Sequence, residues 1–378
     1  MNDDEILKAL TEAYAKNGIA LVLGAGISRN SNIPSWWELL EKMVREHVQG
    51  ADERTFTKLT QNNLSLLVIA SLLEEQCGSR FDFVEAVRRT LYGEFPFRGR
   101  AVNKYNNGEF VRFVRSGKVE EAYQKTDVHY TPNQTLRGVG ALCVVRRQEL
   151  NGKGKPVWRN FANPKVRAIA TLNMDALLQT YVSAFSTKHL LRTVERPSAE
   201  PYPQEINLYH MHGYLHFAPA KKAHRRDSTE AVVLTEQDYF DFFNQPNSMF
   251  NYTFLHLLRE YPCLFIGLSM QDENVRRLLH YSKLERMRAL AKKLGTTTEK
   301  LGKKQDLMEK EIRRHFAILP RNQEPHVNTA NRQTLNALGV KVVWVDSFSE
   351  IRDLLQTLYE SSLEDRDHWA EVYGREQG

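Results

Sequence analysis

The apolar positions along this chain follow two alternating patterns, one with helical spacing and one typical of short buried strands. A first helix is predicted from about Asp4 to Lys16, because its apolar residues recur every three or four positions. It leads into Gly18–Leu23, an apolar run that predicts a buried strand. Similar runs predict five more strands, at residues 166–171, 206–210, 262–267, 316–319 and 340–345. Helical stretches separate most of them, which predicts an α/β fold with a Rossmann-like parallel sheet of about six strands and helices on both faces.

Between the first two predicted strands the pattern is helical throughout. Apolar stripes with a 3.6-residue period predict helices at residues 37–48, 64–76, 81–92 and 134–146. The basic, glycine-containing loop Asn151–Pro156 closes this region. We interpret residues 52–150 as a helical insertion within a single domain that spans residues 1–378.

Two further segments have a recognisable local pattern. Residues 274–314 are helical and heavily charged, and we interpret them as a charged helical arm. The arm is either a solvated hairpin or a docking surface for another subunit or partner. Residues 232–239 predict a strand that ends in a helix N-cap at Thr235, to which we assign no chemistry.

Composition and charge narrow the class of protein. The net charge of +6 arises from 52 basic and 46 acidic residues, so it indicates no surface dedicated to nucleic acid. The three cysteines form no C-x-x-C pair, which favours a reducing compartment and argues against a zinc ribbon; Cys263 is predicted to be a small core residue. The acidic amino terminus and the lack of any run of about 18 apolar residues predict a cytoplasmic protein without membrane spans.

Four predicted strands end in short polar or glycine-rich turns. The turns are Gly24-Ala25-Gly26-Ile27-Ser28, Thr171-Leu172-Asn173-Met174-Asp175, His210-Met211-His212-Gly213 and Gly267-Leu268-Ser269. Open parallel sheets bind ligands at the carboxyl ends of their strands. In the first turn, the glycines would let the backbone approach a pyrophosphate, the following helix would direct free N–H groups at that anion, and Ser28 would add a hydroxyl donor. Tight strand-to-helix turns also use glycine for purely steric reasons.

The segment from Gly24 to Trp37 resembles the G-A-G-x-S-x-x-x-G-I-P segment that opens the sirtuin fold. Asn32 stands where the family has glycine, a mild departure because asparagine tolerates a left-handed backbone. Protein-deacylating sirtuins continue with aspartate, phenylalanine and arginine, whereas this chain has Ser35-Trp36-Trp37. The resemblance implies that Trp36 supplies an aromatic lid over the nicotinamide and that the arginine is lost. Packing of the next helix is the alternative role for both tryptophans.

The segment Thr171–Asp175 resembles the T-Q-N-I-D segment of the same family. Cleavage of the bond between nicotinamide and ribose builds positive charge on the sugar, and a neutral carboxamide orients a water molecule or a ribose hydroxyl without forming an ion pair. Asn173 suits that role. The resemblance implies that Asp175 contacts the nicotinamide amide; the alternative is that Asp175 caps the helix that starts at Ala176.

The family's general base is the histidine directly before a glycine, which is His212 here. His210, two residues earlier, is predicted to be a supporting residue that is held by hydrogen bonds. A metal held by these two histidines is not expected, because no acidic or cysteine partner stands at a ligand spacing. Gly267–Ser269 resembles the family's G-T-S segment, which approaches the phosphates and adenosine of the cofactor. Asp272 either caps the next helix or helps to fix a ribose hydroxyl.

The segment from Gly267 to Leu278 looks like a form found in sirtuin-like proteins of bacterial antiphage defence, and the zinc module of the deacylases cannot be built without two C-x-x-C pairs. The resemblance implies a zinc-free NAD glycohydrolase that cleaves NAD, as its substrate, to nicotinamide and ADP-ribose in abortive infection. It also implies activation through homo-oligomerisation or a partner such as a HerA-type ATPase. A regulatory subunit that binds NAD or ADP-ribose without cleaving it is the alternative, followed by a protein deacylase.

Overall fold

The computed structural model describes residues 2–93, 133–143, 146–150, 152–153, 156–160, 165–179, 182, 191–195, 205–216, 232–244 and 249–361. The chain divides into two compact units. The first unit consists of Met1–Gly24, Arg137–Ala170 and Met249–Gly378. The second consists of Ala25–Leu136 and Thr171–Ser248.

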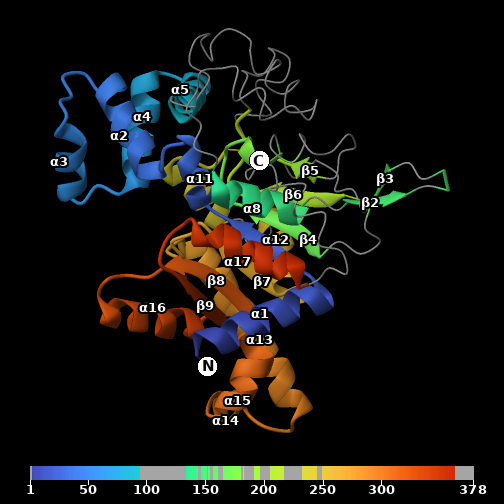
Figure 1. Ribbon diagram of the computed structural model, residues 1–378. Helices are drawn as coiled ribbons and strands as arrows, with labels where there is room; N and C mark the ends of the chain where they lie inside the picture. The colour runs from blue at the N-terminus through green and yellow to red at the C-terminus, as the bar shows by residue number, and fades with distance from the viewer. Residues whose placement is uncertain are drawn as a thin grey trace. The chain divides into compact units, whose positions relative to one another are not determined.

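Seven strands form one parallel sheet in the order β5-β6-β4-β1-β7-β8-β9 (Figure 1). Their bounds are Ile19–Leu23 (β1), Val166–Thr171 (β4), Leu191–Val194 (β5), Ile206–His210 (β6), Cys263–Ile266 (β7), His315–Pro320 (β8) and Val340–Val345 (β9). Apart from the edge strand β5, the chain runs from β1 outward to β4 and β6, and then from β7 outward to β8 and β9. This is the usual Rossmann order, with its reversal between β1 and β7. The predicted α/β class is confirmed, and the six predicted strands are present with one addition.

The additional strand, β5, carries a weak sequence signal. It has four residues at the edge of the sheet, and only Val194, its last residue, is buried. By contrast β1, β7 and β9 are buried at every position, which is typical of parallel strands covered on both faces. A hydrophobic run therefore identifies a strand that is buried along its whole length, including β9 at the other edge of the sheet, but not β5.

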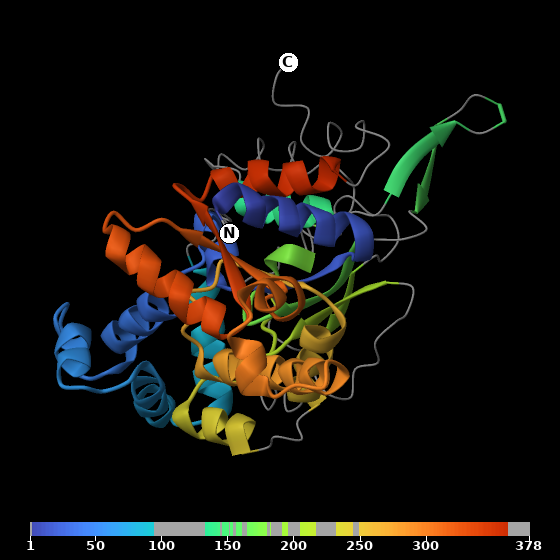
Figure 2. The ribbon, with the colours of Figure 1, turned by 90° about the horizontal axis from the view of Figure 1, so that it is seen from below.

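Helices of the first unit cover both faces of its strands. Figure 2 shows α1 (Asp3–Asn17) and α17 (Glu350–Glu360) on one side of β1 and β7–β9, and α12 (Met249–Glu260) and α13 (Glu273–Lys293) on the other. The helix α16 (Pro325–Ala337) packs against β9. No helix in the described part of the chain is long and apolar enough to cross a membrane.

The charged arm begins with α13 and continues through α14 (Thr298–Gly302), α15 (Gln305–Leu307) and a π-helical turn (Met308–Ile312). These segments have a small apolar core of their own. Its buried members are Met287, Ala291, Leu301, Met308 and Ile312. The arm is thus a helical hairpin that is solvated on its outer surface and packed within.

The second unit contains the predicted helices that follow the first glycine turn. They are α2 (Trp36–His47), α3 (Thr55–Gln61), α4 (Leu66–Cys77) and α5 (Arg80–Tyr92). The side chains of Ser35, Ser65 and Ser79 accept hydrogen bonds from backbone N–H groups three residues later, so a serine caps α2, α4 and α5. These three helices pack against one another. Residues 94–132 of the predicted insertion lie outside the described residues.

The end of the predicted insertion differs from expectation. The helix predicted for residues 134–146 is α8 (Gln134–Cys143), which ends three residues early. Arg146–Leu150 forms β2, which pairs in antiparallel fashion with β3 (Pro156–Asn160), so these residues belong to a hairpin. Gly152 and Lys153, within the predicted loop Asn151–Pro156, form a turn between the two strands.

The strand predicted at Val232–Leu234 is wrong, whereas the helix predicted after it is present as α11 (Glu236–Asn244). Side chains form hydrogen bonds with the backbone groups that would otherwise pair with a neighbouring strand. The Val232 carbonyl accepts a hydrogen bond from Arg80, and the Leu234 N–H donates to Asp238. The predicted N-cap is confirmed, because the Thr235 hydroxyl accepts from the Asp238 N–H at 3.3 Å.

Candidate functional site

In the first unit, the glycine turns after β1 and β7 lie against each other. The two strands pair in parallel with Leu23 opposite Ile266, and the Gly24 N–H donates to the Ile266 carbonyl at 3.0 Å. A Cβ atom on Gly24 would lie 2.6 Å from the Gly267 carbonyl oxygen, so the approach requires glycine. The strand order reverses here, and folds of this class bind ligands outside such a reversal.

The residues after β7 have separate roles. Gly267 has a φ of 70°, a left-handed conformation that favours glycine, and Ser269 is exposed in the loop that follows. The Asp272 carboxylate accepts from the Val275 N–H at 2.8 Å and caps α13. The capping role of Asp272 is therefore confirmed, while its contact with a ribose stays a prediction.

No α-helix directly follows the first glycine turn, and the expectation of a helix N-terminus there is wrong. Ala25–Ile27, which includes Gly26, and Arg29–Ser31 form two short 3-10 turns. Asn32 ends the second turn with a φ of 57°, and α2 begins only after Pro34 and the capping residue Ser35. The left-handed backbone expected of Asn32 is confirmed, and it is the reason that the helical run stops.

The two tryptophans lie at the start of α2. Ser35 caps the helix in a capping box: its N–H donates to the Glu38 carboxylate at 2.7 Å and its hydroxyl accepts from the Glu38 N–H. Trp37 contacts the ring of Phe56 edge-on, with ring centroids 4.9 Å apart, which is the packing alternative. Trp36 is partly buried, and its role as a lid stays a prediction.

In the second unit, a short chain of hydrogen bonds joins three predicted site residues. The Ser28 hydroxyl donates to Asp175 Oδ2 at 2.8 Å and accepts from Asn173 Nδ2 at 3.2 Å. All three side chains are buried. Ser28 and Asn173 are 145 positions apart in sequence, so the fold alone brings them together.

This chain of bonds fixes the orientation of the Asn173 carboxamide. A carboxylate only accepts hydrogen bonds, so Ser28 uses its single proton on Asp175. The Ser28 oxygen can then only accept a hydrogen bond from Asn173, and the donor of that bond is the NH2 group. The carbonyl end of the Asn173 carboxamide therefore faces away from Ser28. The Ser28 hydroxyl thus holds the Asn173 carboxamide, and its predicted contact with a phosphate stays a prediction.

Each oxygen of the Asp175 carboxylate accepts a hydrogen bond, and Oδ2 accepts the one from Ser28. Oδ1 accepts from the Leu177 N–H at 3.0 Å, so Asp175 caps the helical turn that follows. Burial raises the pKa of this carboxyl, and its hydrogen bonds with Leu177 and Ser28 oppose that effect. The capping alternative is therefore confirmed, and a contact with nicotinamide stays a prediction.

The turn that carries His212 runs beside the turn that carries Asn173. The Met211 N–H donates to the Thr171 carbonyl at 2.8 Å, and the Leu215 N–H donates to the Met174 carbonyl at 2.7 Å. These bonds flank Asn173 on one segment and His212 on the other. His212 is partly exposed, whereas Asn173 is buried. The two candidate residues thus lie on hydrogen-bonded segments, and their shared action on one ribose stays a prediction.

His210 is a fixed, neutral support for this arrangement. Its Nδ1 lies 2.9 Å from the Asn173 carbonyl oxygen and its Nε2 lies 2.8 Å from Gln179 Nε2. A carbonyl only accepts, so Nδ1 carries the proton and Nε2 accepts from Gln179. Burial lowers the pKa of His210 to about 4. The predicted role of His210 as a hydrogen-bonded support agrees with these contacts.

The low pKa of His210 predicts a pH-dependent stability. Above pH 6.5 the imidazole is neutral in the folded and unfolded chains; between about 6.5 and 4 only the unfolded chain gains a proton. The unfolded state then binds more protons, so the free energy of unfolding falls as pH falls, by about 1 kcal/mol per pH unit from this group. We expect His210→Gln to reduce that slope in denaturant titrations between pH 7 and 5. The variant His326→Gln, at an exposed position, is the control and should keep it.

Asn133 is a site residue that sequence reasoning missed. It is fully buried, and its Nδ2 donates to the Ile27 carbonyl at 2.6 Å and to the Ser31 hydroxyl at 3.0 Å. Its Oδ1 accepts from the Leu136 N–H, so Asn133 also caps α8. A capping asparagine is visible before the predicted helix, but its long-range bonds to the first glycine turn are not. Among the described residues, no three histidine, cysteine, aspartate or glutamate side chains come together as metal ligands.

Comparison with known proteins agrees with the resemblance to sirtuins. Residues 167–343 match the SIR2-like domain family. The chain is also 21% identical over 371 residues to the NAD(+) hydrolase ThsA of Enterococcus faecium. That similarity covers 95% of this chain and 58% of the relative, so the chain spans less than two thirds of the relative's length. Residues 167–343 of this α/β chain are thus similar to SIR2-like domains, and the whole chain is distantly similar to an NAD hydrolase.

Proposed function

We propose that this protein is an NAD glycohydrolase that cleaves NAD with water to nicotinamide and ADP-ribose. The observation that carries the proposal is the Ser28–Asp175 pair, which fixes the carboxamide of Asn173 on a segment paired with the His212 turn. The SIR2-like domain and the distant similarity to an NAD hydrolase support the same reaction. The glycine turns at the β1–β7 reversal are suited to the approach of a dinucleotide phosphate.

The proposed reaction needs only water as a second substrate. The bond between the nicotinamide nitrogen and the ribose carbon breaks, and its electron pair leaves with nicotinamide. The sugar gains positive charge, which the carbonyl dipole of Asn173 stabilises through a water molecule or a ribose hydroxyl. Water attacks the ribose carbon and passes a proton to His212, which later releases it to solvent. The balance is NAD+ plus water to nicotinamide, ADP-ribose and one proton.

Incubation of the purified protein with NAD tests this proposal, with nicotinamide and ADP-ribose followed by chromatography. Equal amounts of both products are the expected result. Tight binding of NAD without product would overturn the proposal in favour of a regulatory subunit. Nicotinamide release that requires an acetylated lysine peptide would indicate a deacylase instead.

The biological role that we propose is depletion of cytoplasmic NAD in antiphage defence, as an effector of abortive infection. The sequence resemblance to bacterial defence proteins supports this role. An enzyme of this kind must be inactive before infection, so we propose control by assembly. NAD levels in cells that carry the wild-type gene should fall after phage infection and should stay constant with an Asn173→Ala variant.

A groove between α12 and α13 is the surface that we propose for assembly with a second copy of this chain. Its volume is about 1040 Å³, and two half-exposed tyrosines, Tyr252 and Tyr281, line it. Both signs of charge also line the groove: its cations are Arg259, Arg286, Arg288 and Lys293, and its anions are Glu260, Glu285 and Glu311. A two-fold interface pairs a surface with itself, so a surface that carries both signs of charge offers each cation an anion on the second copy, and tyrosine and arginine are enriched in interface centres.

The oligomeric mass tests this surface. We expect Tyr281→Glu to convert an oligomer into monomers in sedimentation experiments, because it places a carboxylate in the buried centre of the interface. Phe348→Glu, at a partly exposed residue outside the groove lining, should leave the mass unchanged. A monomeric wild-type chain, or an oligomer that survives Tyr281→Glu, would contradict the proposal; the first result would favour a partner of another kind, such as a HerA-type ATPase.

A further inference from the structure

Helix α5 makes polar contacts at both of its ends: Tyr92 contacts the two turns of the candidate site, and Arg80 contacts a segment that is hydrogen-bonded to one of them. Its first residue, Arg80, and its last residue, Tyr92, both point away from the helix into other parts of the second unit. The helix belongs to the predicted insertion, to which the proposed reaction assigns no role. The contacts of these two side chains therefore indicate how the insertion could act on the candidate site.

The hydroxyl of Tyr92 joins the two turns of the candidate site. It donates to the Leu215 carbonyl at 2.5 Å and accepts from the Ala176 N–H at 3.0 Å. Ala176 follows Asp175 directly, and Leu215 lies three residues after His212. Tyr92 is fully buried, and burial together with the charge of Asp175 raises its pKa, so the hydroxyl keeps the proton that it donates.

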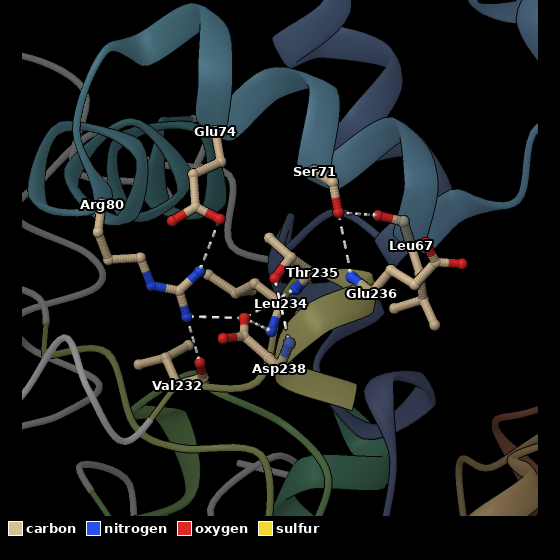
Figure 3. A network of polar contacts seen from close by, with 9 residues as sticks. All are labelled: Leu67, Ser71, Glu74, Arg80, Val232, Leu234, Thr235, Glu236 and Asp238. Carbon is tan, nitrogen blue, oxygen red and sulfur yellow. Dashed lines mark hydrogen bonds and ion pairs between the residues drawn. The ribbon is translucent and has the colours of Figure 1, made fainter. Parts of the chain in front are cut away.

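Arg80 holds a third segment, which runs from Val232 to Asp238 (Figure 3). Its guanidinium donates to the Val232 carbonyl at 2.6 Å and pairs with Asp238 at 2.7 Å and with Glu74 at 3.3 Å. The next residue, Val233, donates its N–H to the His212 carbonyl at 2.9 Å. Arg80 therefore fixes the backbone that is hydrogen-bonded to His212 itself.

Helix α4 contributes to the same network. The hydroxyl of Ser71 accepts from the Glu236 N–H at 3.2 Å, as Figure 3 shows, and Asp238 accepts from the Leu234 and Thr235 N–H groups. The start of α11 is thus bound to the insertion through both α4 and α5. Movement of these helices would be passed to the segment next to His212.

We propose that Tyr92 is a positioning residue, whose hydroxyl sets the spacing between the Asp175 turn and the His212 turn, and that α5 couples the insertion to NAD cleavage. This inference rests on the proposed function. Simple packing does not account for the contacts, because phenylalanine would fill the same volume without a buried hydroxyl. The two bonds of that hydroxyl go to the two turns that the reaction needs in register.

The variant Tyr92→Phe tests the proposal, since it keeps the ring and removes only the hydroxyl that joins the two turns. We expect kcat for nicotinamide release to fall about 10- to 50-fold while KM changes less than threefold, because the turns lose alignment rather than the ability to bind. Hydrogen exchange of the backbone amides at residues 174–178 and 212–216 should become at least fivefold faster. The matched control is Tyr14→Phe, at a buried tyrosine of α1, for which neither change is expected.

Arg80→Met is the second variant and acts at the other end of α5. It should lower kcat and accelerate exchange at residues 212–216 and 233–238, with the amides at 174–178 less affected. Exchange rates at the two turns that match wild type in Tyr92→Phe, or a loss of kcat no larger than in Tyr14→Phe, would overturn the proposal. If the wild-type protein releases no nicotinamide, the proposed function fails. The hydrogen-exchange rates of the backbone amides still decide whether the Tyr92 hydroxyl holds the two turns together.

Discussion

Replacement of Asn173 by alanine is expected to lower kcat for nicotinamide release by about 100- to 1000-fold, the range found when a fixed dipole that stabilises transition-state charge is removed. The large effect follows from how the carboxamide is held. Ser28 accepts from its NH2 end and Asp175 fixes the proton of Ser28, so the carbonyl end has one orientation before NAD binds. Because this dipole is already oriented, no free energy is spent on turning it, and its full interaction energy stabilises the transition state. Release of nicotinamide, measured under saturating NAD, gives kcat directly.

The control for this experiment is Asn251→Ala. Asn251 is a buried asparagine in α12 whose side chain accepts from Asn274 Nδ2 at 3.1 Å, so its loss removes a buried polar contact of similar kind. We expect a lower melting temperature and an unchanged kcat for this variant. If Asn173→Ala and Asn251→Ala lose the same fraction of kcat, the effect is one of stability and Asn173 has no role in cleavage.

Asn173→Asp separates the dipole from the shape of the side chain. The new side chain is nearly isosteric, but it has no NH2 group to donate to Ser28. We expect a large loss of kcat at neutral pH, because Ser28 cannot accept a hydrogen bond from a carboxylate. Activity equal to wild type would show that the orientation imposed by Ser28 is not needed.

The second large effect is expected for Gly24→Ala. The added Cβ would lie 2.6 Å from the Gly267 carbonyl oxygen and 2.6 Å from a side-chain carbon of Leu268. Both contacts are shorter than van der Waals packing allows, and one partner is backbone, so the β1 and β7 turns must separate. We expect the free energy of unfolding to fall by about 1–3 kcal/mol or more and the affinity for NAD to fall at least tenfold. Denaturant titration and calorimetric titration with NAD measure the two effects.

Gly152→Ala is the matched control. Gly152 lies in the β2–β3 turn, where an added Cβ meets nothing within 4 Å. The same substitution there should change neither the free energy of unfolding nor NAD affinity by a measurable amount. If Gly24→Ala behaves like Gly152→Ala, the close approach of the two turns is not a requirement of the fold.

The fold could be predicted from the sequence where hydrophobicity is continuous. The central strands β1, β4 and β7 are buried along almost their whole length, so their apolar runs identify them. The edge strand β5 and the hairpin β2–β3 were missed, because strand pairing rather than a long apolar run defines them. At Val232–Leu234 the apolar run is present but Arg80 and Asp238 take the backbone groups that pairing needs.

The candidate site could be predicted only as a set of residue types. The sequence, through its resemblance to sirtuins, indicated Asn173, Asp175 and His212 in that order. It did not indicate that Ser28 holds Asn173, that Asn133 holds the first glycine turn, or that Tyr92 joins the Asp175 turn to the His212 turn. These contacts join residues about 80 to 150 positions apart, and no local pattern encodes their geometry.

The sequence by itself determined the α/β class, the places where strands end and the residue types at those ends, because burial and backbone preference are local properties of a short segment. Only the tertiary structure decided which of these side chains meet, which way the Asn173 carboxamide points and which helix holds the two turns in register. The physical reason is that a hydrogen bond depends on the distance and direction between two groups. For residues far apart in the chain, the packing of the whole unit sets both.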